Sequence, residues 1–138
     1  MEAPVDEPEF LRWRDEAERA FGAARREAAA ENHNWSCFLA EQAAQLAVKA
    51  LLHGLGRGPW GHDLEGLVES VGEAGVEVPE EVTSGARLLA RHYIPARYPD
   101  AQPASSPGSR YVPEDSELAL RAGERVLAFV DRTWDSLR

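Results

Sequence analysis

Two side chains in the second half of the chain, an arginine and a histidine, have types that can transfer a proton and stabilise a phosphate. Arg87 and His92 lie five positions apart. A histidine can accept a proton near neutral pH, and an arginine can stabilise the charge that develops when a 2′-hydroxyl attacks phosphorus. Five residues along an ideal helix rotate by about 500°, so the two side chains diverge by about 140°. A catalytic pair therefore needs a kink or a dimer interface, and the alternative is a surface arginine beside a half-buried histidine.

A second candidate site is a local concentration of positive charge. The segment 82–99 contains three arginines and no acid, whereas the whole chain has a net charge of −9. Such a segment on an acidic protein can face a phosphate, so we predict that Arg91 and Arg97 bind phosphate. Tyr93, Tyr98 and Tyr111 could stack on a base there, and Tyr98 is included among the predicted binding residues. In the alternative interpretation, Arg97 pairs with an acid such as Glu41 or Asp100 and the tyrosines pack.

Composition excludes several other classes of protein. A chain this acidic is a poor general binder of nucleic acid. Its one cysteine, Cys37, allows no intrachain disulfide and no four-thiolate zinc site, and we expect it to be buried. The four histidines show no spacing typical of metal ligands, so we predict no metal and no cofactor. His33 and His53 are expected at the surface, and His62 at the start of a helix.

The first residues and the hydropathy of the chain predict a location in the cytoplasm. No apolar run approaches the roughly 20 residues that a membrane helix needs. The first eight residues are acidic and contain two prolines, whereas a secretory signal begins with basic residues and continues with an apolar stretch. We therefore expect no membrane partner and no secretory signal.

Hydrophobic periodicity predicts an all-α, up-and-down bundle of four to five helices. No window alternates with a period of two, so we predict no strands. We expect a mobile lead over residues 1–8 and one domain over residues 9–138. The predicted helices cover residues 9–32, 34–53, 63–73, 79–94 and 113–134, and a Pro-rich loop covers residues 95–113.

The second predicted helix has two distinct stripes. Asn34 is a plausible N-cap for it. Small side chains form one stripe and let another helix approach closely, which predicts a central position in the bundle; they are Ala40, Ala43, Ala47 and Ala50. The other stripe carries Gln42 and Lys49 among apolar residues. This polar pair forms either a hydrogen-bond network or part of a binding site, and Lys49 is included among the predicted phosphate-binding residues.

Several short motifs, taken in order, resemble one family. The second predicted helix reads Trp35-Ser-Cys-Phe-Leu-Ala-Glu-Gln-Ala-Ala-Gln-Leu-Ala-Val-Lys-Ala-Leu-Leu. It is followed by His62-Asp63-Leu64, by Ala96-Arg97-Tyr98-Pro99-Asp100, by Tyr111-Val-Pro-Glu and by Ala122-Gly-Glu-Arg-Val-Leu. In this order and spacing, the chain from Phe10 to Trp134 resembles a HEPN domain (higher eukaryotes and prokaryotes nucleotide-binding).

The resemblance implies a helical bundle that forms a homodimer, with one of two functions. One is RNA cleavage by an Arg-x(4–6)-His motif, often as the toxin of a toxin–antitoxin pair. The other is nucleotide binding by a partner of a minimal nucleotidyltransferase. Arg87 and His92 match the motif's spacing, but Leu88 follows Arg87 where the motif usually has a polar residue, and members with Arg-Tyr-Pro-Asp often lack the motif.

Our leading prediction is therefore a dimeric module that binds a nucleotide or an RNA phosphate and acts with a minimal nucleotidyltransferase. The enzyme alternative is a metal-independent endoribonuclease that uses Arg87 and His92. A third alternative is a structural interaction protein whose arginines only form salt bridges.

Overall fold

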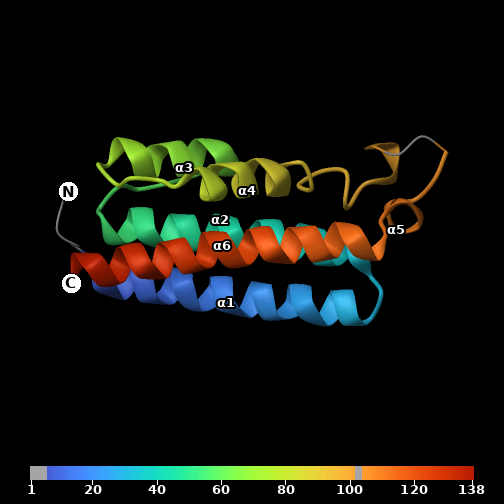
Figure 1. Ribbon diagram of the computed structural model, residues 1–138, viewed down its shortest axis with the longest axis horizontal. Helices are drawn as coiled ribbons and strands as arrows, with labels where there is room; N and C mark the ends of the chain where they lie inside the picture. The colour runs from blue at the N-terminus through green and yellow to red at the C-terminus, as the bar shows by residue number, and fades with distance from the viewer. Residues whose placement is uncertain (1–5, 102–103) are drawn as a thin grey trace.

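Three long helices lie side by side, and two shorter helices cover one side of them (Figure 1). The computed structural model describes residues 6–101 and 104–138. The long helices are α1 (Glu7–Ala29), α2 (His33–Gly54) and α6 (Pro113–Leu137), and the shorter ones are α3 (Leu64–Glu73) and α4 (Glu80–Ala90). A 3₁₀ turn, η1 (Pro99–Ala101), and a one-turn helix, α5 (Pro107–Arg110), precede α6. No strand occurs in the described residues, which confirms the predicted all-α bundle.

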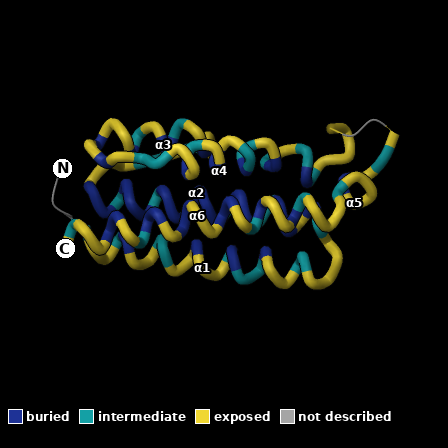
Figure 2. The backbone as a smooth tube through the Cα atoms, viewed as in Figure 1, coloured by how far each residue is buried: buried dark blue, intermediate teal, exposed yellow. Residues whose placement is uncertain are grey.

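Helix α2 occupies the centre of the bundle, as its small side chains predict. It contacts α1, α3, α4 and α6, and most of its length is coloured as buried in Figure 2. The stripe of Ala40, Ala43, Ala47 and Ala50 is fully buried, together with Cys37. Because an alanine side chain occupies little space between two helix backbones, neighbouring helices approach α2 closely. Burial raises the pKa of the Cys37 thiol to about 12, so Cys37 is a packing residue.

One end of the bundle is closed by two stacked aromatic rings. Phe10 of α1 and Trp134 of α6 stack with their ring centroids 4.0 Å apart and nearly parallel. They lie over Gly54, the last residue of α2, and a Cβ atom there would collide with the Trp134 ring. A glycine is therefore required for this close approach of the three long helices.

The helix starts differ from the predicted ones by one or two residues. Asp6 caps α1 by accepting a hydrogen bond from the Glu9 backbone N–H at 3.1 Å, so residues 7 and 8 belong to the helix rather than to the predicted lead. Residues 1–5 of that lead lie outside the described part. Helix α2 begins at His33, and Asn34 is not its N-cap: its Nδ2 donates to the Ala96 carbonyl at 3.0 Å.

The predicted fourth helix ends four residues early. Helix α4 stops at Ala90 instead of Ile94, and residues 91–97 form turns. The predicted loop over 95–113 contains η1 and α5, while its residues 102 and 103 lie outside the described part. At the other end of this loop, the Val112 N–H donates to Asp115 Oδ2 at 2.8 Å and starts α6. The turns after α4 form the site described next.

None of the helices in residues 6–101 and 104–138 is both long enough and apolar enough to cross a lipid bilayer.

Candidate functional site

The guanidinium of Arg97 lies among three aromatic rings. Its Cζ atom is 4.4 Å from the ring centroid of Phe38, 4.6 Å from that of Tyr93 and 4.9 Å from that of Tyr98. We call these three rings the Arg97 cage. The Arg97 Nε also donates to the Tyr93 carbonyl at 2.8 Å. Cation–π attraction and this hydrogen bond together fix the position of a half-buried positive charge.

The cage is built by the turns that follow α4. The backbone N–H groups of Arg97 and Tyr98 both donate to the Ile94 carbonyl, at 3.0 and 3.3 Å. The hydrogen bond from Asn34 to the Ala96 carbonyl ties these turns to the start of α2. Because Phe38 lies one turn further along α2 than Asn34, this bond also sets the distance between Phe38 and the arginine.

Arg97 keeps its outer nitrogens unpaired. Within the described residues, no carboxylate lies within the 4.0 Å ion-pair distance of its guanidinium, and neither terminal nitrogen has a hydrogen-bond partner. The alternative in which Arg97 pairs with Glu41 or Asp100 is therefore not seen. A guanidinium with two free, parallel N–H groups can bind a phosphate or carboxylate through two hydrogen bonds.

A buried carboxylate with its own hydrogen-bond network lies beside the cage on α2. Glu41 is fully buried and accepts hydrogen bonds from Gln42 Nε2 at 2.9 Å and from Gln45 Nε2 at 2.5 Å. Burial raises the pKa of Glu41, while the two hydrogen bonds and the charges of Arg97 and Lys49 oppose this rise. The Gln45 Oε1 continues the network to His62 Nδ1, 3.3 Å away.

His62 was not among the predicted site residues, and the structure places it at the cage. Its ring stacks on the Tyr93 ring with centroids 5.2 Å apart and an interplanar angle of 20°. Asp63, rather than His62, caps α3, because its Oδ1 accepts from the Gly66 N–H at 3.1 Å. The sequence signal was present in the one-turn spacing of Glu41 and Gln45, but only the packing of α3 on α2 brings His62 to them.

The other predicted phosphate-binding residues are placed differently. Tyr98 belongs to the cage and is 45% exposed. Arg91 is exposed at the end of α4, and no hydrogen bond or ion pair joins its side chain to another described residue. Lys49 lies eleven residues after Phe38, about 16 Å along the α2 axis, and its Nζ is 5.9 Å from the Trp13 ring centroid. The structure therefore brings Arg97 and Tyr98 together, whereas Lys49 lies away from the Arg97 cage, further along α2.

Arg87 and His92 have separate surroundings. Arg87 is exposed and forms an ion pair with Glu65 of α3, with Nε and Oε2 3.7 Å apart. His92 is 8% exposed, and its Nδ1 lies 2.9 Å from the Tyr111 hydroxyl. Burial, with a contribution from the charge of Arg91, lowers the pKa of His92 to about 4. Within this chain the two side chains do not meet in an open cleft, and His92 is neutral at physiological pH.

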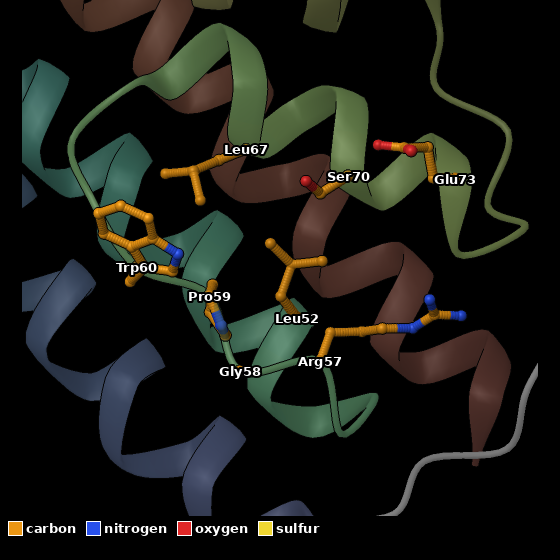
Figure 3. Close-up of a pocket in the computed structure, with 8 residues that line it drawn as sticks. All are labelled: Leu52, Arg57, Gly58, Pro59, Trp60, Leu67, Ser70 and Glu73. Atoms are coloured by element: carbon orange, nitrogen blue, oxygen red, sulfur yellow. The ribbon is translucent and has the colours of Figure 1, made fainter.

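A cavity of about 320 Å³ lies elsewhere, between the end of α2 and α3 (Figure 3). Its lining residues are Leu52, Arg57, Gly58, Pro59, Trp60, Leu67, Ser70 and Glu73. In Figure 3, Leu52 and Leu67 form its apolar part, and Trp60 stands on the loop at its edge, 88% exposed. None of the predicted site residues lines this cavity. In residues 6–101 and 104–138, no group of three or more His, Cys, Asp or Glu side chains is arranged to hold a metal ion.

Fold and sequence together define the class of protein. The family model of the HEPN domain matches residues 10–133. The chain therefore belongs to the HEPN domain family, as its motifs indicated.

Three solved structures are similar over nearly their whole length. TT1696 from Thermus thermophilus is 35% identical, with a TM-score of 0.86 over 89% of this chain and 96% of that one. ST0689, an archaeal HEPN homologue, is 28% identical, with a TM-score of 0.77 over 91% and 97%. An HEPN domain protein from Thermotoga maritima is 27% identical, with a TM-score of 0.72 over 90% and 98%. No curated protein matches the chain.

Proposed function

We propose that the protein is a dimeric module that binds the phosphate of a nucleotide or of RNA at Arg97 and acts with a minimal nucleotidyltransferase. The observation that carries this proposal is the state of Arg97: it is half-buried, held by three rings and a backbone carbonyl, and has both terminal nitrogens free. A preorganised guanidinium loses little entropy when it binds an anion. Tyr98, at 45% exposure, is available to stack on a base.

The face of α2 next to the cage supports dimer formation. Trp35 is 44% exposed and contacts Phe38 of the cage edge to face, while Leu39 and Leu46 are only partly buried. These side chains leave an apolar strip on the central helix that a second copy of the chain would cover. Because Phe38 belongs both to α2 and to the cage, such a dimer would place two phosphate sites along one interface.

We propose the nucleotidyltransferase partner and a role in a toxin–antitoxin pair because both functions are known in the HEPN family. A binding module with a single preorganised arginine fits the partner role, because it can hold the phosphate of a substrate without chemistry of its own. Co-expression with a minimal nucleotidyltransferase from the same genome, followed by size-exclusion chromatography, tests the pairing. Separate elution of the two proteins at micromolar concentration would contradict it.

The endoribonuclease alternative has less support. It requires His92 to accept a proton, but this side chain is buried against Tyr111. It also requires Arg87 to meet a phosphate, and Arg87 is engaged with Glu65 of α3. We therefore retain binding as the proposed function.

Titration calorimetry at fixed low salt tests the binding proposal. ATP, GTP and a short RNA are titrated into the wild type and into Arg97→Ala, with Arg125→Ala as a matched control that removes an exposed arginine from α6. Loss of even one charge-assisted hydrogen bond corresponds to roughly 1.5–3 kcal/mol, so Arg97→Ala should weaken binding by at least tenfold. If the wild type binds none of these ligands, or if both variants lose the same affinity, Arg97 is a structural residue that holds its turn.

A further inference from the structure

A chain of hydrogen bonds leads from the core of the bundle to the Arg97 cage. It begins at the fully buried Glu41, passes through Gln45, which is 2% exposed, and ends at the exposed His62. The Gln45 amide uses its nitrogen toward Glu41 Oε2, at 2.5 Å, and its oxygen toward His62 Nδ1, at 3.3 Å. The other oxygen of Glu41 accepts from Gln42 at 2.9 Å. Both carboxylate oxygens thus act as acceptors.

This arrangement determines where the proton of His62 lies. An amide oxygen can only accept a hydrogen bond, so the His62 Nδ1 that faces Gln45 must carry hydrogen. In a neutral imidazole the other nitrogen, Nε2, then has a lone pair and can only accept. Glu41 is what orients Gln45, because a carboxylate holds the nitrogen end of the amide and leaves its oxygen end for His62.

His62 and Arg97 lie on one shared ring. The Tyr93 ring centroid is 5.2 Å from the centroid of His62 and 4.6 Å from Arg97 Cζ. The two side chains are therefore no farther apart than the sum of these distances, a span that one nucleotide can cover. A ligand whose phosphate binds Arg97 can place a hydrogen-bond donor of its sugar or base near His62.

We propose that His62 is the second ligand-binding residue of the Arg97 site, and that buried Glu41, acting through Gln45, positions it to accept a hydrogen bond from a hydroxyl or amino group of a nucleotide. The inference rests on the proposed function of Arg97 for its ligand, but the positioning of His62 can be measured on the free protein. Glu41 is a positioning residue, since its carboxylate bonds only to Gln42 and Gln45 among the described residues.

A purely structural role explains these residues less well. Asp63 already caps α3, so His62 is not needed to start that helix. A fully buried carboxylate is costly, and a well-packed apolar residue at position 41 would stabilise the bundle at least as well. A site that needs one defined tautomer of an exposed histidine accounts for both the buried acid and its orientation of Gln45.

The first measurement is the tautomer of His62, from the ¹⁵N chemical shifts of its imidazole above the pH at which it is protonated. The wild type should show the Nδ1–H form. Gln45→Met removes both hydrogen bonds at similar volume and should return His62 to the Nε2–H form that an unconstrained side chain favours. Glu41→Gln should shift the balance in the same direction, because a neutral amide orients Gln45 less strongly. The signals of His33 and His53 serve as internal controls.

An Nε2–H tautomer in the wild type would overturn the positioning role, and so would an unchanged His62 spectrum in both Gln45→Met and Glu41→Gln. Far-UV circular dichroism identifies a variant that fails to fold. In that case the wild-type tautomer alone decides, because it is read without any substitution.

The second measurement compares ligands with and without a hydrogen-bond donor. Sulfate has none at neutral pH, ribose 5-phosphate has only hydroxyls, and AMP adds an amino group. His62→Ala should lower the affinity for AMP about tenfold, which corresponds to one lost hydrogen bond. The affinity for sulfate should change by less than twofold. His62→Gln, which keeps a polar atom near the Nε2 position, should recover part of the loss. Arg97→Ala should lower the affinity for all three ligands.

The pattern across ligands separates the two proposals. If His62→Ala lowers the affinity for ribose 5-phosphate as much as that for AMP, the group that donates to His62 is a hydroxyl. If only the affinity for AMP falls, the donor is the amino group of the base. If His62→Ala loses the same affinity for sulfate as for AMP, or loses none for AMP, the proposed ligand-binding role of His62 is wrong. If the wild type binds none of the three, the proposed function fails together with that role, while the tautomer still decides whether Glu41 positions His62.

Discussion

The buried state of His92 predicts a specific dependence of stability on pH. Its pKa is lowered to about 4 in the folded protein, chiefly by burial, against an ordinary value of 6.5. In the unfolded chain His92 takes up a proton below pH 6.5, whereas in the folded chain it stays neutral until about pH 4. Between these values the unfolded state binds more protons, so stability falls as the pH falls.

The size of this effect follows from the two pKa values. Each pKa unit corresponds to about 1.4 kcal/mol, so the contribution of His92 to the free energy of unfolding drops by about 3 kcal/mol when the pH falls from above 6.5 to below 4. At pH 5 the unfolded chain is almost fully protonated at this position, and about 2 kcal/mol is already lost. That is a large part of the stability of a small domain.

Urea denaturation between pH 7.5 and 4.5, on the wild type and on His92→Asn, measures the effect. Asparagine does not titrate and keeps a polar atom near the position of Nδ1, where it can still meet Tyr111. The difference between the two proteins removes the contributions of other groups such as Glu41, whose raised pKa acts in the opposite direction. We expect the difference in unfolding free energy to shift by about 2 kcal/mol between pH 7 and pH 5. Parallel curves would refute the buried, neutral state of His92.

Further predictions concern assembly, activity and packing. Leu46→Glu should convert a dimer into a monomer in sedimentation velocity at micromolar concentration, whereas Leu118→Glu, on the exposed side of α6, should not; a monomeric wild type would contradict the proposed interface. Single-stranded RNA incubated with the protein and EDTA should be cleaved slowly or not at all, and robust cleavage abolished by His92→Ala would reinstate the endoribonuclease. Gly54→Ala should destabilise the protein by roughly 1–3 kcal/mol through overpacking, whereas Gly72→Ala, whose Cβ would meet nothing within 4 Å, should stabilise it by roughly 0.4–1 kcal/mol in thermal unfolding.

Local sequence rules predicted the helices well where packing and pattern agree. The small stripe of α2 identified the central helix, because alanine spacing reports directly on close approach. The end of α4 was predicted less well. Pro95 stops any helix, but His92 and Tyr93 already donate to carbonyls three residues back, at Leu89 and Ala90. His92 also lies 2.9 Å from the Tyr111 hydroxyl through its Nδ1 atom, and a sequence window around α4 does not contain that partner.

The candidate site shows the same limit more strongly. Arg97 and Tyr98 are neighbours in sequence, so their joint role could be predicted from the motif. Phe38, which lies on α2, and His62, which lies before α3, reach Arg97 only through the packing of three segments on one another. A charge pattern along the chain reveals where positive charge gathers, but not which rings hold it or which histidine lies nearby.

No carboxylate of the described residues pairs with Arg97, and this affects how the site binds and releases anions. In the described part of the chain no internal anion occupies the two terminal nitrogens of Arg97, so an incoming phosphate displaces only water or a dissolved ion and does not have to break an existing ion pair. The same openness makes the site a receptor for whatever anion the solution contains. Phosphate or sulfate buffers would therefore compete directly with a nucleotide, and the occupancy of the site in the cell would follow the balance between inorganic phosphate and its phosphorylated ligand.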